Sequence, residues 1–188
     1  TLHRVLQEGA IGEVHTIHFN GQHPLNYGVR PKWYFEEGKH GGTINDIAVH
    51  AIDAIPWLTG RSIVEITAAR GWNARLKQHP AFQDGGAVML RLDNGGVVTG
   101  DVPYLTPDAQ GDTFPVYWRF TMFGSEGALE AGYTSNAITV YRKDDKNVCT
   151  IPLDAGRPGG CFDDFLADIA GTPRPGGLDM ARVSRNSR

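Results

Sequence analysis

The segment GGTINDIAVHAIDAIPWLTG, from Gly41 to Gly60, carries the clearest helical pattern in the chain. Asp46, His50 and Asp53 recur at spacings that place them on one side of an α-helix. The aliphatic side chains fall roughly opposite, where they can be buried: Ile44, Ile47, Ala48, Ala51, Ile55 and Leu58. We therefore expect a helix over about residues 42–58, with Pro56 bending or fraying its last turn.

The polar side of this helix combines an imidazole with carboxylates. His50 is the residue type that titrates near neutral pH, and Asp46 lies one turn before it, an arrangement suited to proton transfer. The solvated outer face of an ordinary helix would show the same residues. Asp53 lies one turn beyond His50, where it would either support the imidazole or face solvent.

The composition is that of a folded domain without a basic or membrane-spanning segment. Of 188 residues 40% are hydrophobic, which suits one domain with its own core. Lys and Arg number 18 against 21 Asp and Glu, so we expect no nucleic acid partner and no membrane partner. No apolar run approaches the length of a membrane span. Cys149 and Cys161 form no CxxC motif, and a cytoplasmic location is expected.

Alternating apolar residues predict a run of strands on both sides of the helix. The expected strands are Glu13–His23, Ile63–Ala74, Gly86–Leu92, Val97–Tyr104, Val116–Phe123, Ala128–Ala131, Ala137–Arg142 and Val148–Ile151. Asp93–Gly96 supplies a hairpin turn between two of them, because Asn and Gly accept positive φ. The pattern predicts an α+β domain with a large, predominantly antiparallel sheet and helices on one face.

Apolar residues occur on both sides of the strand near residue 120. Trp118 and Phe120 share one side, whereas Tyr117 and Phe123 share the other. We expect the second sheet face to meet a partner subunit, which makes a homo-oligomer. A curled sheet that covers itself is the alternative.

Both ends of the chain carry helical patterns. Thr1–Glu8 resembles the end of a longer helix, so we expect a partner domain before it. Cys161–Ala170 has an apolar stripe that includes Phe165, and we expect this closing helix to pack against the domain. The tail Leu178–Arg188 begins a further helical pattern.

The loop Pro24–His40 before the helix is long and aromatic, which is typical of a functional loop. Arg30, Lys32, Trp33 and Tyr34 make this loop suited to the binding of a polyol, and the two cations would equally bind a carboxylate or phosphate. Trp33 would alternatively anchor the loop in the core. Weaker candidates for the same cleft are His23, Asn20 and Tyr104.

Three segments, in this order, carry a resemblance to one protein family. They are GAIGEV at Gly9–Val14, the segment Gly41–Gly60, and WRFTMFGSEGALEA at Trp118–Ala131. Together they resemble the carboxy-terminal domain of the Gfo/Idh/MocA oxidoreductases, which include glucose–fructose oxidoreductase and inositol dehydrogenase. The resemblance runs from about residue 1 to about residue 171. It implies that residues 1–188 form a dihydrodipicolinate reductase-like domain for substrate binding and oligomerisation.

The resemblance also implies a nicotinamide cofactor and roles for two residues. In this family an amino-terminal Rossmann domain binds NAD or NADP. The chain contains neither GxGxxG nor the family's Glu-Lys-Pro segment with its catalytic lysine, so we expect both upstream and the fragment alone to be inactive. The family's pattern of glycines, Asp, three residues and His carries over to Asp46 and His50. His50 would exchange the hydroxyl proton of a sugar, inositol or related polyol, and Asp46 would orient substrate or imidazole.

Two other classes of function fit parts of the sequence. A metal-dependent lyase or isomerase would use Asp46, His50 and Asp53, joined by His40 or His79, as metal ligands, although no HExxH is present. We expect no metal. A non-catalytic sugar-binding or assembly module would use the same pocket without chemistry. The sequence that precedes Thr1 would discriminate this module from a dehydrogenase.

Overall fold

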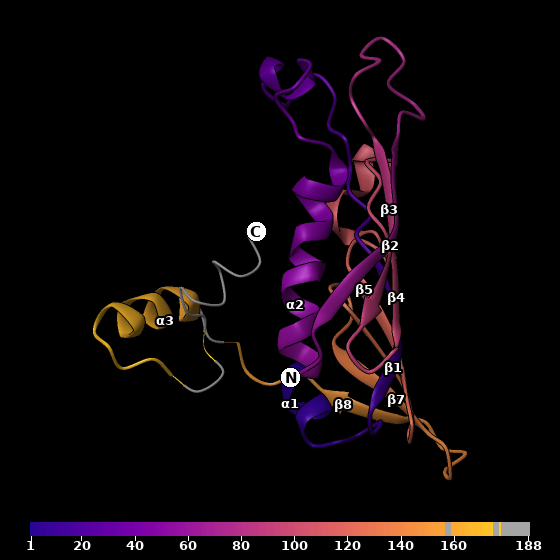
Figure 1. Cartoon of the computed structure of the whole chain (residues 1–188), viewed down its shortest axis with the longest axis vertical. Coiled ribbons are helices and arrows are strands. Elements are labelled where there is room, and N and C mark those ends of the chain that lie inside the picture. Colours follow the sequence, from indigo (N-terminus) through magenta and orange to yellow (C-terminus); the bar gives the residue numbers. More distant parts are fainter. Residues whose placement is uncertain (157–158, 175–176, 178–188) are drawn as a thin grey trace.

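One large sheet forms the body of the molecule (Figure 1). The structure, a computed structural model, describes residues 1–156, 159–174 and 177. The strands lie in the order β2-β3-β4-β1-β5-β6-β7-β8, and all neighbours are antiparallel except β1 and β4. Their bounds are β1 (Val14–Asn20), β2 (Ile63–Trp72), β3 (Gly85–Leu92), β4 (Val97–Asp101), β5 (Arg119–Gly124), β6 (Gly127–Gly132), β7 (Ala137–Arg142) and β8 (Cys149–Pro152). The predicted α+β class is confirmed.

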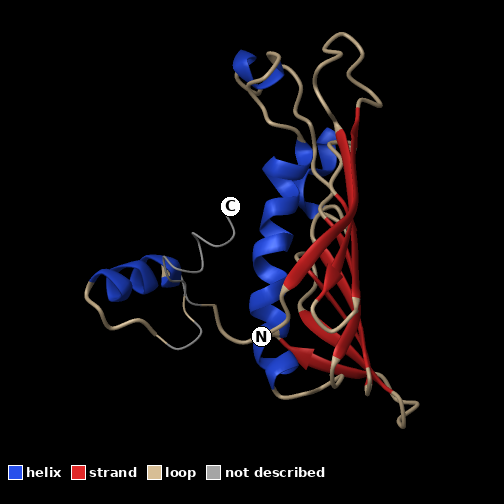
Figure 2. Ribbon diagram, in the orientation of Figure 1, coloured by secondary structure: helices blue, strands red, loops and turns tan. Residues whose placement is uncertain are grey.

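The helices α1 (Leu2–Gln7) and α2 (Val49–Thr59) lie on one face of this sheet (Figure 2). The predicted helix begins with a π-helical turn, η2 (Ile44–Ala48), which continues into α2. A π-turn is rare and widens the helix, so the polar side chains do not follow the regular α-helical spacing. The expected fraying at Pro56 is not observed, because the N–H of Gly60 donates to its carbonyl at 2.9 Å.

The inner face of the helix layer is buried against the sheet. Ala51 and Ile55 are completely buried, as are Ile17, Leu92 and Met122 from the facing strands. The helix approaches β3 closely at Gly86, where an added Cβ would lie 2.5 Å from the hydroxyl of Thr43. This packing fixes the start of the helical segment over the sheet.

Three strands end earlier than the sequence predicts: β1 ends at Asn20 and not at His23, and β2 and β4 are also shorter. β2 ends at Trp72 because the carboxylate of Asp84 accepts the next amides, those of Ala74, Arg75 and Leu76, at 2.5–2.9 Å. β4 extends only to Asp101, and a 3₁₀ segment kinked at Gly111, η3 (Asp108–Thr113), occupies part of the following loop. At the end of β2, a polar side chain that captures backbone groups therefore decides the boundary.

The sheet face away from the helices is exposed and partly apolar. Strand register places His18, Thr99 and Thr121 side by side on it, and Phe123 is 45% exposed there. Trp118 and Phe120 are half-buried, and Phe120 pairs with Phe19 on the helical side. The contact of the open face with a second subunit stays a prediction.

The closing helix, α3 (Gly160–Ile169), does not pack as expected. Phe162 and Ile169 are each 68% exposed, and Phe165 is 44% exposed. Figure 1 shows α3 standing away from the sheet and from α2. The periodicity located the apolar side of the helix correctly, but periodicity does not specify a contact surface. The helical pattern in the tail 178–188 lies outside the described residues.

Candidate functional site

The carboxylate of Asp46 lies at the centre of a polar cluster beneath the long loop. One of its oxygens, Oδ2, accepts hydrogen bonds from the hydroxyl of Tyr34 at 2.6 Å, from the hydroxyl of Tyr104 and from Nε2 of His40 at 3.2 Å. The two phenol oxygens are 2.5 Å apart. Among the described residues, no hydrogen bond reaches the other oxygen, Oδ1, and the Asp46 side chain is 38% exposed.

This cluster holds Asp46 as an anion. The hydrogen bond from His40 is the largest influence and lowers the pKa of the Asp46 carboxyl, with the phenols adding to it and burial opposing it. Burial, followed by the contact with Asp46, raises the pKa of Tyr34 to about 12. The same causes raise the pKa of Tyr104. Both phenols are therefore protonated donors at neutral pH.

Four separate segments bring these groups together. Tyr34 lies in a 3₁₀ turn, η1 (Lys32–Phe35), and Tyr104 follows β4. Gly41 and Gly42, with φ of +79° and +86°, turn the chain after His40 into η2, which carries Asp46. The π-turn, rather than the regular helix expected, presents the carboxylate to the loop.

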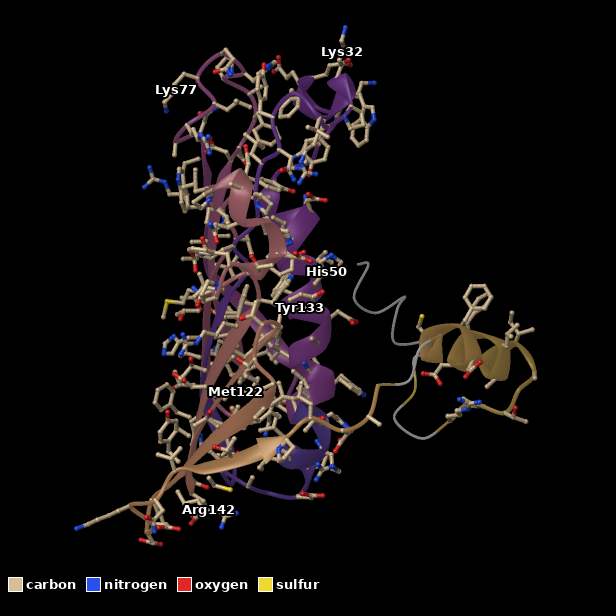
Figure 3. All side chains as sticks on the ribbon, turned by 180° about the vertical axis from the view of Figure 1, so that it is seen from behind. Lys32, His50, Lys77, Met122, Tyr133 and Arg142 are labelled. Atoms are coloured by element: carbon tan, nitrogen blue, oxygen red, sulfur yellow. The ribbon has the colours of Figure 1, made fainter. Side chains whose placement is uncertain are left out.

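His50 lies on α2 next to a wall of aromatic rings. It is exposed, and its ring centroid is 6.2 Å from that of Trp118. The ring of His23 lies 5.7 Å from Trp118 and 4.6 Å from Tyr117. A hollow of about 370 Å³ lies beside Trp118, Phe120 and Tyr133, and its lining includes neither His50 nor His23. Figure 3 shows His50 on the helix, between the tip that carries Lys32 and the end that carries Arg142.

His23 connects the aromatic wall to the Asp46 cluster. Its ring centroid is 6.3 Å from that of Tyr104, and its Nδ1 contacts the carbonyl of Gly21 at 2.8 Å. Burial lowers the pKa of His23, and the charges of Arg30, Asp46 and His50 all act on it. These four polar side chains therefore lie around one region, although no hydrogen bond of the described residues joins Asp46 to His50.

Of the remaining sequence candidates, Arg30 and Lys32 line a common pocket, whereas Trp33, Asp53 and Asn20 do not line it. Arg30 lies over the rings of Tyr34 and Tyr104, and Lys32 lines a pocket with it. Trp33 is 51% exposed, so it does not anchor the loop in the core. Asp53 is half-buried one turn beyond His50. Asn20 is turned toward Asp101, to which its amide donates at 2.6 Å.

Comparison with known proteins identifies the family of this domain. The family model of the GFO/IDH/MocA C-terminal domain matches residues 1–130. The chain belongs to this family. No curated protein matches it significantly.

Solved structures share the fold of this GFO/IDH/MocA domain. A protein classed as an oxidoreductase from Erwinia carotovora atroseptica is 26% identical, with a TM-score of 0.81 over 98% of this chain and 56% of the other. One from Thermotoga maritima is 23% identical, with a TM-score of 0.80 over 99% and 54%. A levoglucosan dehydrogenase in complex with NADH is 20% identical, with a TM-score of 0.72 over 98% and 56%. The chain thus spans about half the length of these proteins.

Sequence reasoning did not bring the cluster around Asp46 together. It named Tyr104 only as a weak candidate, considered His40 only as a metal ligand, and named Tyr34 only as one of the loop residues suited to a polyol. No spacing rule joins residues 34, 40, 46 and 104, because the loops that connect them are irregular. The aromatic content of the loop was the available signal for Tyr34.

Two further findings concern function classes. Within the described residues, no group of three or more His, Cys, Asp and Glu side chains is arranged to hold a metal ion. His79 contacts Tyr27 instead of joining Asp46. The same part of the chain has no helix long and apolar enough to cross a membrane.

Proposed function

We propose that this domain is the substrate-binding and catalytic half of an NAD(P)-dependent dehydrogenase that acts on a sugar, inositol or related polyol, as a cytoplasmic homo-oligomer. The observation that carries the proposal is the state of Asp46. One carboxylate oxygen is held by three donors, while the other has no hydrogen bond from the described residues and is available to a substrate hydroxyl. His50, two residues past the π-turn that carries Asp46, is exposed beside the aromatic wall.

In this proposal, Asp46 and His50 have different roles in alcohol oxidation. An alcohol loses its hydroxyl proton as hydride leaves the carbon, so a base must lie within hydrogen-bond reach of the hydroxyl. We assign that base to His50, because an exposed imidazole can accept a proton and pass it to water. Asp46 keeps its charge and accepts a hydrogen bond from the same or a neighbouring hydroxyl. It thereby orients the substrate toward His50.

The aromatic wall and the loop supply the rest of the substrate site. Trp118 and His23 offer ring faces to the apolar side of a sugar, and Arg30 and Lys32 offer donors to its oxygens. Trp33, which is exposed at the loop, and Asp53, one turn beyond His50, complete the proposed contacts. Each of these roles concerns binding and not the transfer of hydride.

In this proposal, this chain meets only the reactive end of the cofactor. The sequence contains no GxGxxG motif that would cradle a pyrophosphate, so a separate nucleotide-binding domain must hold most of NAD or NADP. When bound, the nicotinamide supplies the hydride acceptor or donor. The residues of this chain hold the hydroxyl and move its proton.

An assay of the full-length protein tests the proposal. Reduction of NAD and NADP is followed spectrophotometrically with a panel of sugars and inositols, and the product is identified by mass spectrometry as the carbonyl compound. Turnover with at least one polyol is expected. Binding of sugars without any turnover, by a protein that binds either dinucleotide, would instead indicate a non-catalytic sugar-binding module.

A further inference from the structure

A second pocket lies at the tip of the molecule, where two loops meet. Figure 3 shows Lys32 and Lys77 there, one on each loop, at the end opposite Arg142. The pocket has a volume of about 460 Å³, within the range of small-molecule sites. We call it the Arg30–His79 pocket, and its lining residues are Tyr27, Gly28, Arg30, Lys32, Phe35, Glu36 and His79.

The loop that carries His79 is held rigidly. The side-chain amide of Asn73 donates to the carbonyls of Leu76, His79 and Phe82 at 2.8–2.9 Å. At its other end, the fully buried carboxylate of Asp84 accepts three backbone N–H groups. Such a network fixes the backbone before any ligand arrives.

The two loops also contact one another inside the pocket. The hydroxyl of Tyr27 lies 3.0 Å from Nε2 of His79. The ring of Phe35 packs against both, with centroids 5.1 Å and 5.2 Å away. The floor of the Arg30–His79 pocket is therefore a preformed aromatic surface and not a gap between independent loops.

Arg30 is held in place in the pocket, but the positive charge of the lining is not neutralised. Nε of Arg30 donates to the carbonyl of Leu25 at 2.7 Å, and its guanidinium lies 4.5 Å from the ring centre of Tyr34. Among the described residues, neither Arg30 nor Lys32 forms an ion pair, and Glu36 is the single carboxylate in the lining. Two cations against one exposed carboxylate leave a net positive lining. Nε and Nη2 of Arg30 donate to backbone carbonyls, and Nη1, which has no hydrogen bond among the described residues, is left to donate to an anion.

The Arg30–His79 pocket adjoins the Asp46 cluster. The guanidinium of Arg30 lies over both phenol rings whose hydroxyls contact Asp46, at 4.5 Å and 5.0 Å from their centres. His23 experiences the charges of both Arg30 and Asp46. A ligand whose charged group contacts Arg30 would thus extend its other end toward Asp46.

We infer that the Arg30–His79 pocket binds an anionic substituent, a carboxylate or a phosphate, on the sugar substrate. Arg30 and Lys32 make the charged contacts, His79 lies at the pocket wall, and the sugar ring extends past Arg30 toward Asp46 and His50. The inference rests on the proposed dehydrogenase function for the identity of the sugar as substrate. It narrows that function from neutral polyols to sugar acids or sugar phosphates.

Calorimetric titration of the full-length protein tests this inference with three probes: D-glucose, D-glucuronate and D-glucose 6-phosphate. At least one anionic sugar is expected to bind tenfold or more tightly than glucose, with a preference that shrinks at high ionic strength. The two anionic probes distinguish a carboxylate from a phosphate site. Equal binding of all three, or no binding of either anionic sugar, would overturn the inference.

Two variants and a matched control complete the test. Arg30→Gln is expected to weaken binding of the anionic sugar about tenfold to hundredfold, and Lys32→Gln about threefold, with a smaller loss for glucose, which has no charged contact to lose. Lys32 is exposed, so its variant keeps the fold even if Arg30→Gln disturbs the loop. Lys39→Gln changes an exposed lysine of the same loop outside the pocket lining and is expected to have no effect.

The inference and the proposed function fail in different ways. Tight, Arg30-dependent binding of an anionic sugar without oxidation would support the pocket and refute the dehydrogenase. Oxidation of neutral sugars without any preference for anionic ones would support the dehydrogenase and refute the pocket. Loss of anion binding in Lys39→Gln as well as Lys32→Gln would also refute it, because the effect would then be one of overall charge.

Discussion

The segment η2–α2 and the helix α3 carry similar apolar stripes but differ in what those stripes contact. In α2, Ala51 and Ile55 are completely buried against the sheet. In α3, Phe162 and Ile169 are 68% exposed. Because the inner face of α2 packs against the sheet, the side chains on its outer face are held in a fixed position. A catalytic side chain requires such a fixed position. The exposed stripe of α3 provides no such anchoring in this structure.

The largest effect is expected on that outer face, at His50. His50→Ala removes the proposed base and should lower turnover of the full-length protein by about 10²–10⁴-fold, as usual for the loss of a positioned acid or base. The thermal unfolding midpoint should not change, because the side chain is exposed. His15→Ala, an exposed histidine on β1, is the matched control and should retain full activity. An unchanged turnover rate in His50→Ala would show that His50 is not the base.

On the inner face of α2, a substitution should lower the stability of the fold. Ile55→Ala creates a cavity between α2 and the sheet and should lower the free energy of unfolding by about 2–5 kcal/mol. Denaturant unfolding of the purified protein measures this loss. Ile52→Ala, at a half-buried position in the same helix, should cost clearly less. Equal costs at the two positions would contradict the described packing.

Substitution of Asp46 should affect both activity and stability, because Asp46 joins the helix to the loop through hydrogen bonds. Asp46→Asn removes the charged acceptor and should cost about 1 kcal/mol of stability, since the side chain is partly exposed. It should also lower turnover about tenfold to hundredfold if Asp46 orients the substrate.

The stability difference between Asp46→Asn and the wild type should depend on pH. Because the folded-state pKa of Asp46 lies below its ordinary value, the ionised carboxylate stabilises the fold above about pH 4. That contribution is lost as the pH falls toward the depressed pKa. The difference should therefore be constant from pH 6 to 8 and shrink in acid, and a difference that grew in acid would contradict the hydrogen-bond network.

The fold could be predicted from the sequence wherever the pattern was regular. The strand Ala137–Arg142 has the predicted bounds, and the helix after Gly42 was placed within two residues. The π-turn at Ile44–Ala48 could not be predicted, because its residues are ordinary helix formers. The early end of β2 depends on Asp84, whose partners are backbone amides that have no sequence signature.

Only part of the candidate site could be predicted from the sequence. Asp46 and His50 share one helical segment, so their spacing drew attention to them. Tyr34, His40 and Tyr104 come from two loops and meet Asp46 only in the folded chain. Sequence distance gives no information about such contacts, and a long aromatic loop indicates only that something of this kind is present.

The smallest effect is expected in α3. Phe165→Ala removes a ring that is 44% exposed, so the free energy of unfolding should change by no more than about 0.5 kcal/mol, as for other surface positions. A ring buried against the sheet, as the sequence pattern alone suggested, would cost about 3–5 kcal/mol instead. Denaturant unfolding of this variant beside Ile55→Ala separates the two cases. A loss as large as that of Ile55→Ala would show that α3 is packed in solution, and the contrast between the two helices would then be wrong.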